Sequence, residues 1–295
     1  MKTPSLSILV LLGLAATQLA RAAPPAQVGD SLFYVALQEG LHDRYIEFLY
    51  LGPDGTCKLL SSVHSTYYTP GEGSSGTTFG SSQSGAYTYG PSNLPNTDAA
   101  ITINIGANSD VYQLTFFDGT SGQASSINGS AVGPFSLLIA APNVSLANVS
   151  NRVTLRSTDT AISGFVIEGG ATRLVLIRAV GPSLAAFGVS PVSGNPRLNL
   201  FTGTGTGLIG SGQKWCTVLG IDAQAMGWIF GLAGAFQLQS GSNDVVILGL
   251  LGPGVYTAGA TDATTGAGGG SALTEVYILP YSGNLPPDLP AFFIN

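Results

Sequence analysis

The sequence predicts an all-β protein, in which an antiparallel, barrel-like meander precedes a β-sandwich and at most one short helix is present. Three observations support this. Glycine occurs 41 times in 295 residues, about twice the usual ~7%, and it disfavours helix interiors. Short stretches of alternating apolar and polar residues recur along the chain. Turn residues separate them at a spacing of roughly 8–12 residues, which is typical of sheets built from hairpins.

The first 22 residues have the layout of a secretory signal peptide. Lys2 precedes an apolar stretch over residues 6–16, and the triplet Ala20-Arg21-Ala22 resembles a cleavage site. The stretch is shorter than the ~20 residues needed to cross a bilayer. We therefore expect residues 1–22 to be removed, the protein to be exported to the periplasm, the cell surface or the medium, and the mature chain to contain no transmembrane helix.

Residues 23–126 are expected to form the meander. The sequence Gly52-Pro53-Asp54-Gly55 is strong turn chemistry, and it predicts a hairpin. Further strands alternate cleanly between apolar and polar residues, so each can bury one face. The expected strands are residues 32–37, 45–51, 58–60, 85–89, 100–105 and 111–117.

Residues 127–134 have little periodicity and are expected to link the two modules. Residues 135–281 are expected to form the β-sandwich, because short stretches rich in β-branched and aromatic residues recur between turn signals. Its one expected helix covers residues 221–230, with Asp222 near its start and Gly231 at its end. Residues 282–295 contain several prolines, which predicts an extended tail. The expected strands are residues 162–167, 173–180, 197–201, 244–251, 255–260 and 273–279.

Composition excludes some partners. Charged residues make up 9% of the chain and the formal net charge is −6, so no basic surface is expected for nucleic acid. The two cysteines, Cys57 and Cys216, are compatible with a disulfide between the modules in an oxidising compartment. They are also compatible with two separate buried thiols, because cysteine is among the most often buried residues.

The second module resembles an exported β-sandwich module that recurs in large secreted and surface proteins of environmental bacteria. The resemblance covers about residues 135–279 and is densest at residues 176–189, with further matches at 146–152, 162–170, 234–236, 240–244, 252–257 and 273–277. It implies the architecture and no particular activity. Residues 211–215 depart from the relatives' Asn-Asp-Asn-Trp-like turn, and Gln213 and Lys214 are poor replacements for oxygen ligands of a cation. The first module resembles, less specifically, Thr/Tyr-rich meanders that precede such modules.

No catalytic constellation is visible in the sequence. His42 and His64 are the only histidines, and no Gly-x-Ser-x-Gly elbow is present. Most carboxylates lie in turn-like contexts, where they bond backbone amides. No cofactor is expected, although weak calcium binding is compatible with the turns around Asp244 and Asp262. The candidate carboxylates are Asp98, Asp110, Asp118, Asp222, Asp244, Asp262 and Glu275.

Aromatic residues are the remaining candidates for binding. Trp215, Tyr67 and Tyr68 are expected to offer a stacking surface for sugars if they are exposed. We therefore expect a non-catalytic exported protein for adhesion, scaffolding or envelope assembly, with surface polysaccharide, other envelope proteins or further copies joined at strand edges as partners. The alternatives are a carbohydrate-binding protein and a secreted hydrolase.

Overall fold

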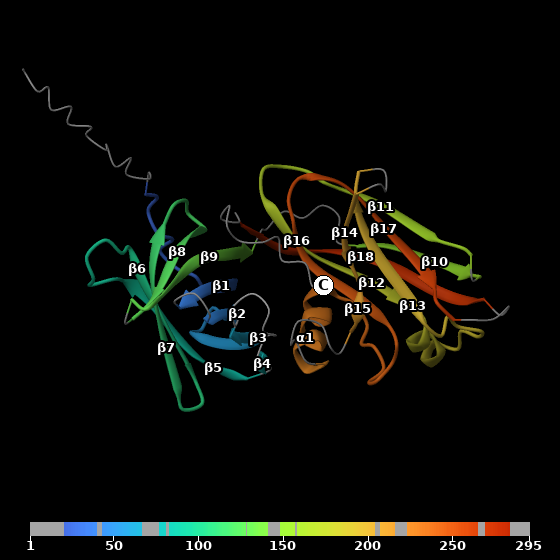
Figure 1. Ribbon diagram of the computed structural model, residues 1–295, viewed down its shortest axis with the longest axis horizontal. Coiled ribbons are helices and arrows are strands. Elements are labelled where there is room, and N and C mark those ends of the chain that lie inside the picture. Colours follow the sequence, from blue (N-terminus) through green and yellow to red (C-terminus); the bar gives the residue numbers. More distant parts are fainter. Residues whose placement is uncertain are drawn as a thin grey trace, which may run out of the picture.

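The computed structural model describes residues 21–39, 43–66, 77–80, 83–127, 129–140, 148–156, 158–203, 207–215, 223–264 and 269–283. The all-β fold predicted from the sequence is confirmed (Figure 1). Residues 1–20 of the expected signal peptide (1–22) and residues 284–295 of the expected tail (282–295) lie outside the described residues.

The strands of the first half follow one another as a meander. They are β1 (Ser31–Glu39), β2 (Asp43–Leu51), β3 (Thr56–Thr66), β4 (Thr77–Gly80), β5 (Ser84–Pro91), β6 (Ala99–Ile105), β7 (Asn108–Phe116), β8 (Ser121–Ser126) and β9 (Ala131–Ala140). Each pairs antiparallel with its neighbour in the order β1-β2-β3-β5-β6-β7-β8-β9, and β9 pairs back onto β1. We call these eight strands the closed sheet. Between β2 and β3, the Gly52 amide donates to the Thr56 carbonyl at 2.7 Å. The hairpin turn predicted there is therefore confirmed.

Every second side chain of each strand points into the closed sheet, and most of these side chains are apolar. Phe33 of β1, Leu49 of β2, Ile101 of β6 and Phe116 of β7 are all buried there, and the Phe116 and Phe135 rings meet edge to face at 5.0 Å. Burial of such large side chains supplies much of the driving force for folding.

Two strands of the closed sheet were not expected from the sequence. β8 and β9 occupy residues in which no regular alternation is visible, and the segment expected to be a linker, 127–134, contains the start of β9. Glycine makes this closure feasible, since a Cβ at Gly133 would lie 1.9 Å from the Ala36 carbonyl oxygen of β1. The closed sheet therefore continues through residue 140.

The second half is a β-sandwich of two layers. Its elements are β10 (Asn148–Leu155), β11 (Ala161–Ile167), β12 (Thr172–Val180), the 3-10 helix η1 (Pro182–Phe187), β13 (Pro196–Thr202), β14 (Gly207–Ser211), β15 (Gln213–Lys214), α1 (Ala223–Ala233), β16 (Val245–Leu251), β17 (Gly254–Asp262) and β18 (Gly270–Gly283). One layer has the order β10-β18-β12-β16-β15 and the other β11-β17-β13-β14. Apolar residues of both layers, such as Ile177 and Leu200, form the core between them.

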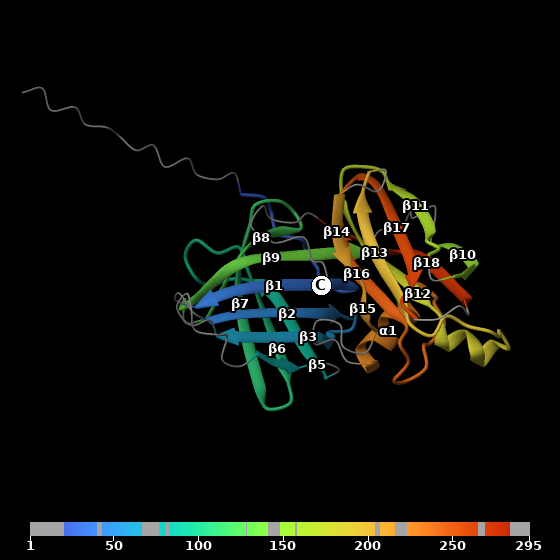
Figure 2. The same ribbon diagram turned by 45° about the vertical axis from the view of Figure 1, so that its right-hand side comes forward.

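The closed sheet and the sandwich are joined in two ways. The end of β18 pairs with the end of β9, with Tyr281 opposite Ala140. In addition, α1 lies between the two halves (Figures 1 and 2), where Trp228 packs on Tyr50 of β2 at 4.8 Å between ring centroids. The outer faces of β1, β2 and β12 are therefore apolar as well as their inner faces.

The helix lies close to its predicted position, but its end differs. α1 continues past Gly231 and ends at Ala233, so the expectation that Gly231 terminates it is wrong. Gly234 has φ +68°, its amide donates to the Gly231 carbonyl, and the Ala235 amide donates to the Phe230 carbonyl. This is a Schellman ending, which needs a left-handed residue at position 234. Over the described parts of the chain, no helix has the length and apolar character to span a bilayer.

Candidate functional site

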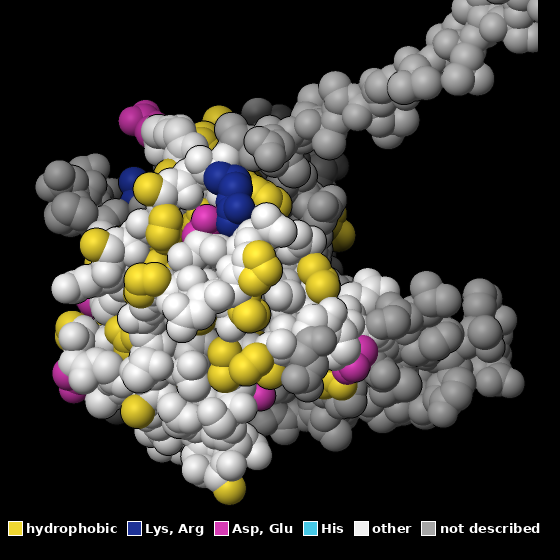
Figure 3. All heavy atoms as spheres, turned by 90° about the vertical axis from the view of Figure 1, so that its left-hand side faces the viewer, with side chains coloured by type: hydrophobic (Ala, Val, Ile, Leu, Met, Phe, Trp, Pro, Cys, Tyr) yellow, Lys and Arg dark blue, Asp and Glu magenta, His cyan; other side chains and the backbone are white. Residues whose placement is uncertain are grey.

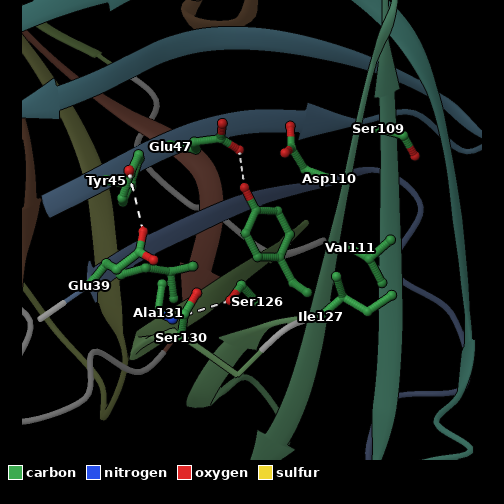
Figure 4. Close-up of a pocket in the computed structure, with 12 residues that line it drawn as sticks. Glu39, Tyr45, Glu47, Ser109, Asp110, Val111, Ser126, Ile127, Ser130 and Ala131 are labelled. Carbon is green, nitrogen blue, oxygen red and sulfur yellow. Dashed lines mark hydrogen bonds between the residues drawn. The ribbon is translucent and has the colours of Figure 1, made fainter. Parts of the chain in front are cut away.

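A hollow of about 400 Å³ opens at one end of the closed sheet (Figure 4). We call it the mouth pocket. Eight-stranded closed sheets are wide enough inside to hold one small ligand, and binding sites occur preferentially at such openings. It is lined by Leu37, Glu39, Tyr45, Glu47, Ser109, Asp110, Val111, Tyr112, Ser126, Ile127, Ser130 and Ala131.

Strand alternation places the polar side chains of the pocket. On β2, Glu47 has the same inward parity as Leu49 and Leu51, which are buried in the apolar interior. On β7, Asp110 and Tyr112 have the same parity as the buried Leu114. The apolar core thus gives way to acidic and hydroxyl groups at the end where β2 and β7 begin.

Tyr112 and Glu47 are hydrogen-bonded across the pocket. The Tyr112 hydroxyl donates to Oε2 of Glu47 at 2.6 Å. Burial raises the pKa of Glu47 from its ordinary 4.5 to about 7; the hydrogen bond from Tyr112 opposes this rise, and the nearby Asp110 adds to it. Burial also raises the pKa of Tyr112 well above 10, so its hydroxyl remains a donor at neutral pH.

Two acidic side chains of the mouth pocket have no compensating cation among the residues that the structure describes. Among the described residues, Oε1 of Glu47 and the carboxylate of Asp110 have no hydrogen-bond or ion-pair partner. Partial burial raises the pKa of Asp110 too. At the other side of the pocket, the Tyr45 hydroxyl points to Oε2 of Glu39 at 3.5 Å (Figure 4). The described residues that line the pocket include no lysine or arginine.

This arrangement can attract a cation or exchange a proton. A positive ligand would offset the repulsion between Glu47 and Asp110 and would lower the pKa of Glu47. Serine hydroxyls and Tyr45 can add hydrogen bonds, while Leu37 and Ile127 can contact an apolar part of the ligand. A group of three metal-ligating side chains is absent from the described residues.

Trp215 does not provide the exposed stacking surface considered from the sequence. It is 4% exposed, and its ring packs 6.0 Å from that of Phe230. Its indole nitrogen donates to Oγ of Ser242 at 3.0 Å, and Ser242 in turn donates to Asp244 at 2.5 Å. The hydrogen bond to Ser242 satisfies the one polar atom of the ring, which allows the ring to face inward. Tyr67, Tyr68 and Cys216 lie outside the described residues.

Cys57 is a free cysteine in the apolar interior of the closed sheet. Burial raises the pKa of its thiol, which disfavours the reactive thiolate.

The candidate carboxylates that the structure describes, apart from Asp110, are held by protein donors. Asp118 accepts hydrogen bonds from Thr120 and Ser121, and Asp262 accepts them from Thr264, as expected for turn residues. Asp98 accepts a hydrogen bond from the Phe116 amide at 2.8 Å. Asp222 lies outside the described residues.

Asp244 and Glu275 are also occupied. The carboxylate of Asp244 accepts from the Gly181 amide at 2.7 Å and from the Ser183 and Ser242 hydroxyls. Glu275 pairs with the fully buried Arg178. Asp244 and Glu275 thus belong to two buried networks of the second half.

A second hollow, of about 420 Å³, lies at the edge of the sandwich. We call it the edge groove. Its polar lining includes amides and cations, and no aromatic residue is among the described residues that line it. The polar side chains are Asn195, Arg197, Asn199, Ser211, Lys214 and Asn243.

Sequence analysis singled out Asp110 and missed Glu47, Tyr112, Glu39 and Tyr45. A signal was present, because Glu47 stands two residues before Leu49 in an alternating strand. Ile46 and Phe48 obscure it, since they are apolar and face α1 on the outside. In comparisons with known proteins, no family model matches the chain and no curated protein is significantly similar.

Proposed function

We propose that the protein is a non-catalytic, exported protein of the cell surface or envelope, which acts in adhesion, scaffolding or assembly, and that its mouth pocket binds a small cation such as an organic amine. The cation site is supported by the two carboxyl groups of Glu47 and Asp110, which face one hollow. Neither has a cationic partner among the residues that the structure describes. The pairing of β9 with β18 joins the closed sheet to the sandwich, which supports the proposal of a rigid scaffold.

The pocket's size supports a ligand of few atoms. About 400 Å³ is at the lower end of small-molecule sites, which typically measure ~300–1,000 Å³. On the face that Figure 3 shows, charged side chains are few and scattered, so the carboxylates in the pocket contribute strongly to the local field. An anion would meet uncompensated repulsion there.

Isothermal titration with three probes of similar size tests this function. 1,4-Diaminobutane is expected to bind at pH 8, whereas the neutral butane-1,4-diol and the dianion succinate are not. Asp110→Asn is expected to weaken diamine binding by about tenfold, one lost charge interaction near the protein surface. Asp54→Asn, in a distant turn, is the control. Equal binding of the diol, or no diamine binding, would contradict the proposal.

Carbohydrate binding is a second candidate, and the edge groove favours it. Asn195, Asn199 and Asn243 carry amides that suit sugar hydroxyls. Retention on insoluble polysaccharides that Asn199→Ala abolishes would support this function. Unchanged retention in Asn199→Ala and Asn243→Ala would assign it to another surface.

Hydrolysis is a third candidate, because Glu47, with its pKa of about 7, is a suitable general acid and Asp110 lies near it. A screen of glycosides with release of a chromogenic leaving group tests it. Turnover that Glu47→Gln abolishes would favour hydrolysis over binding, and no turnover would leave the mouth pocket as a binding site.

A further inference from the structure

The outer face of the four-stranded layer carries an apolar patch. β11, β17, β13 and β14 bury one side against the other layer and expose the opposite side. Single exposed apolar residues are normal, but here several occupy one continuous face. We call the patch the apolar face; its residues, with exposed fractions where these are high, are Ile162 (64%), Val166 (54%), Leu208 (58%), Val255 (52%) and the half-buried Phe201.

The strand register pairs four of these side chains across neighbouring strands, and Ile162 lies opposite Gly259. Val166 lies opposite Val255, and Phe201 lies opposite Leu208. Thr257 stands between the two pairs, opposite both Gly164 and Phe201. Gly164 and Gly259 have no side chain to project from the middle of the face, so a second flat surface can approach it closely.

Two opposite charges stand at the two ends of the apolar face. Arg197 lies at the start of β13, and Glu168 follows the end of β11, both with outward parity and both exposed. Because β11 and β13 both pair antiparallel with β17, they run in the same direction, so these residues lie at opposite ends, roughly 25 Å apart along the strands. Within the described residues, neither forms an ion pair.

We propose that the apolar face is the interface with a second copy of this chain. A two-fold axis in the plane of the face, perpendicular to the line from Arg197 to Glu168 and through its midpoint, places Arg197 of each copy opposite the partner's Glu168. The same axis brings the outer faces of the two four-stranded layers together. This self-complementarity is the defining property of an isologous interface, and it goes beyond the proposed binding function.

The size of the face indicates a weak contact. Four strands of about seven residues cover roughly 19 by 23 Å, or about 440 Å² per copy. A pair of copies buries about 900 Å², which is below the ~1,200–2,000 Å² of stable, specific interfaces. The dimer is therefore expected to be weak and reversible.

Sedimentation velocity of the purified protein from about 1 to 500 μM, with charge-reversed variants, tests the interface. The proposed dimer contains two Arg197–Glu168 pairs. Either single variant, Arg197→Glu or Glu168→Arg, turns both pairs into like-charge pairs and is expected to weaken the dimer at least about tenfold. The double variant restores both pairs and is expected to return within about threefold of the wild type. Arg152→Glu, an exposed arginine on β10, makes the same charge change away from the face and is expected to have no effect.

Three results would overturn the interface. One is a wild-type protein that stays monomeric throughout this range. Another is a dimer that Arg197→Glu leaves unchanged, or that the double variant fails to restore while circular dichroism shows native structure. A third is a monomer that binds phosphatidylcholine vesicles and loses this binding in Val255→Lys, which would assign the face to a lipid surface.

Discussion

Tyr112 of β7 donates a 2.6 Å hydrogen bond to Glu47 of β2 across the interior of the closed sheet. The two residues are 65 positions apart in sequence, and only closure of the sheet brings them together. A carboxyl group that is buried without a cation resists ionisation, which explains the direction of its pKa.

Stability is expected to depend on the protonation of Glu47. Its pKa is about 7 in the folded protein and 4.5 ordinarily, so the unfolded chain ionises first as the pH rises. The free energy of unfolding therefore falls between pH 4.5 and 7. Glu47→Gln removes this loss of stability. Urea unfolding is expected to show a free energy of unfolding about 1–2 kcal/mol above the wild type at pH 8, allowing for solvent screening, and close to the wild type at pH 4.

The exposed Glu168 offers a matched control. Glu168→Gln, measured at the same low protein concentration, is expected to leave the pH dependence of stability unchanged. A Glu47→Gln variant that is less stable than the wild type at pH 8 would mean that the ionised carboxylate is stabilised in the pocket.

The buried ion pair of Arg178 and Glu275 is expected to be essential for the sandwich. The two residues lie opposite each other on β12 and β18, Nε of Arg178 donates to Oε2 of Glu275 at 2.9 Å, and its Nη1 donates to the Phe236 carbonyl at 2.7 Å. Glu275→Gln leaves the buried guanidinium without a counter-charge and is expected to cost about 3–5 kcal/mol. Urea unfolding measures this cost, and the double variant Arg178→Met/Glu275→Leu is expected to lose less than the sum of its single variants.

Asp244 is expected to hold η1 against β16. Asp244→Ala removes the acceptor of the Gly181 amide and of the Ser183 and Ser242 hydroxyls, which is expected to lower the free energy of unfolding by about 2–4 kcal/mol. Asp159→Ala, in an exposed turn, is expected to cost less than about 1 kcal/mol. If Asp244→Ala and Asp159→Ala lower the free energy of unfolding equally, the buried hydrogen bonds of Asp244 contribute no more than those of a turn residue.

Sequence patterns predicted the strands that have a turn on each side and one apolar face. β8 was missed because only Ala124 among its residues is apolar and buried. β9 was assigned partly to a linker because the requirement for Gly133 comes from the backbone of β1, about 100 residues earlier. Such contacts carry no local signal.

The candidate site was harder to predict than the fold. Polar residues on an alternating strand normally mark its exposed face, but β2 is buried on both sides. Trp215 illustrates the reverse problem: its neighbour Lys214 suggests a surface turn, whereas Ser242 and Phe230 hold the ring inside. Both errors concern which face of a segment is covered, and that depends on tertiary packing.

The pH dependence of diamine binding tests the central claim most directly. The affinity for 1,4-diaminobutane is expected to rise at least about tenfold between pH 5.5 and 8.5, as Glu47 ionises, with proton release near pH 7. Glu47→Gln is expected to bind weakly at both pH values. A pH-independent affinity that is the same in Glu47→Gln would contradict a cation site in the mouth pocket.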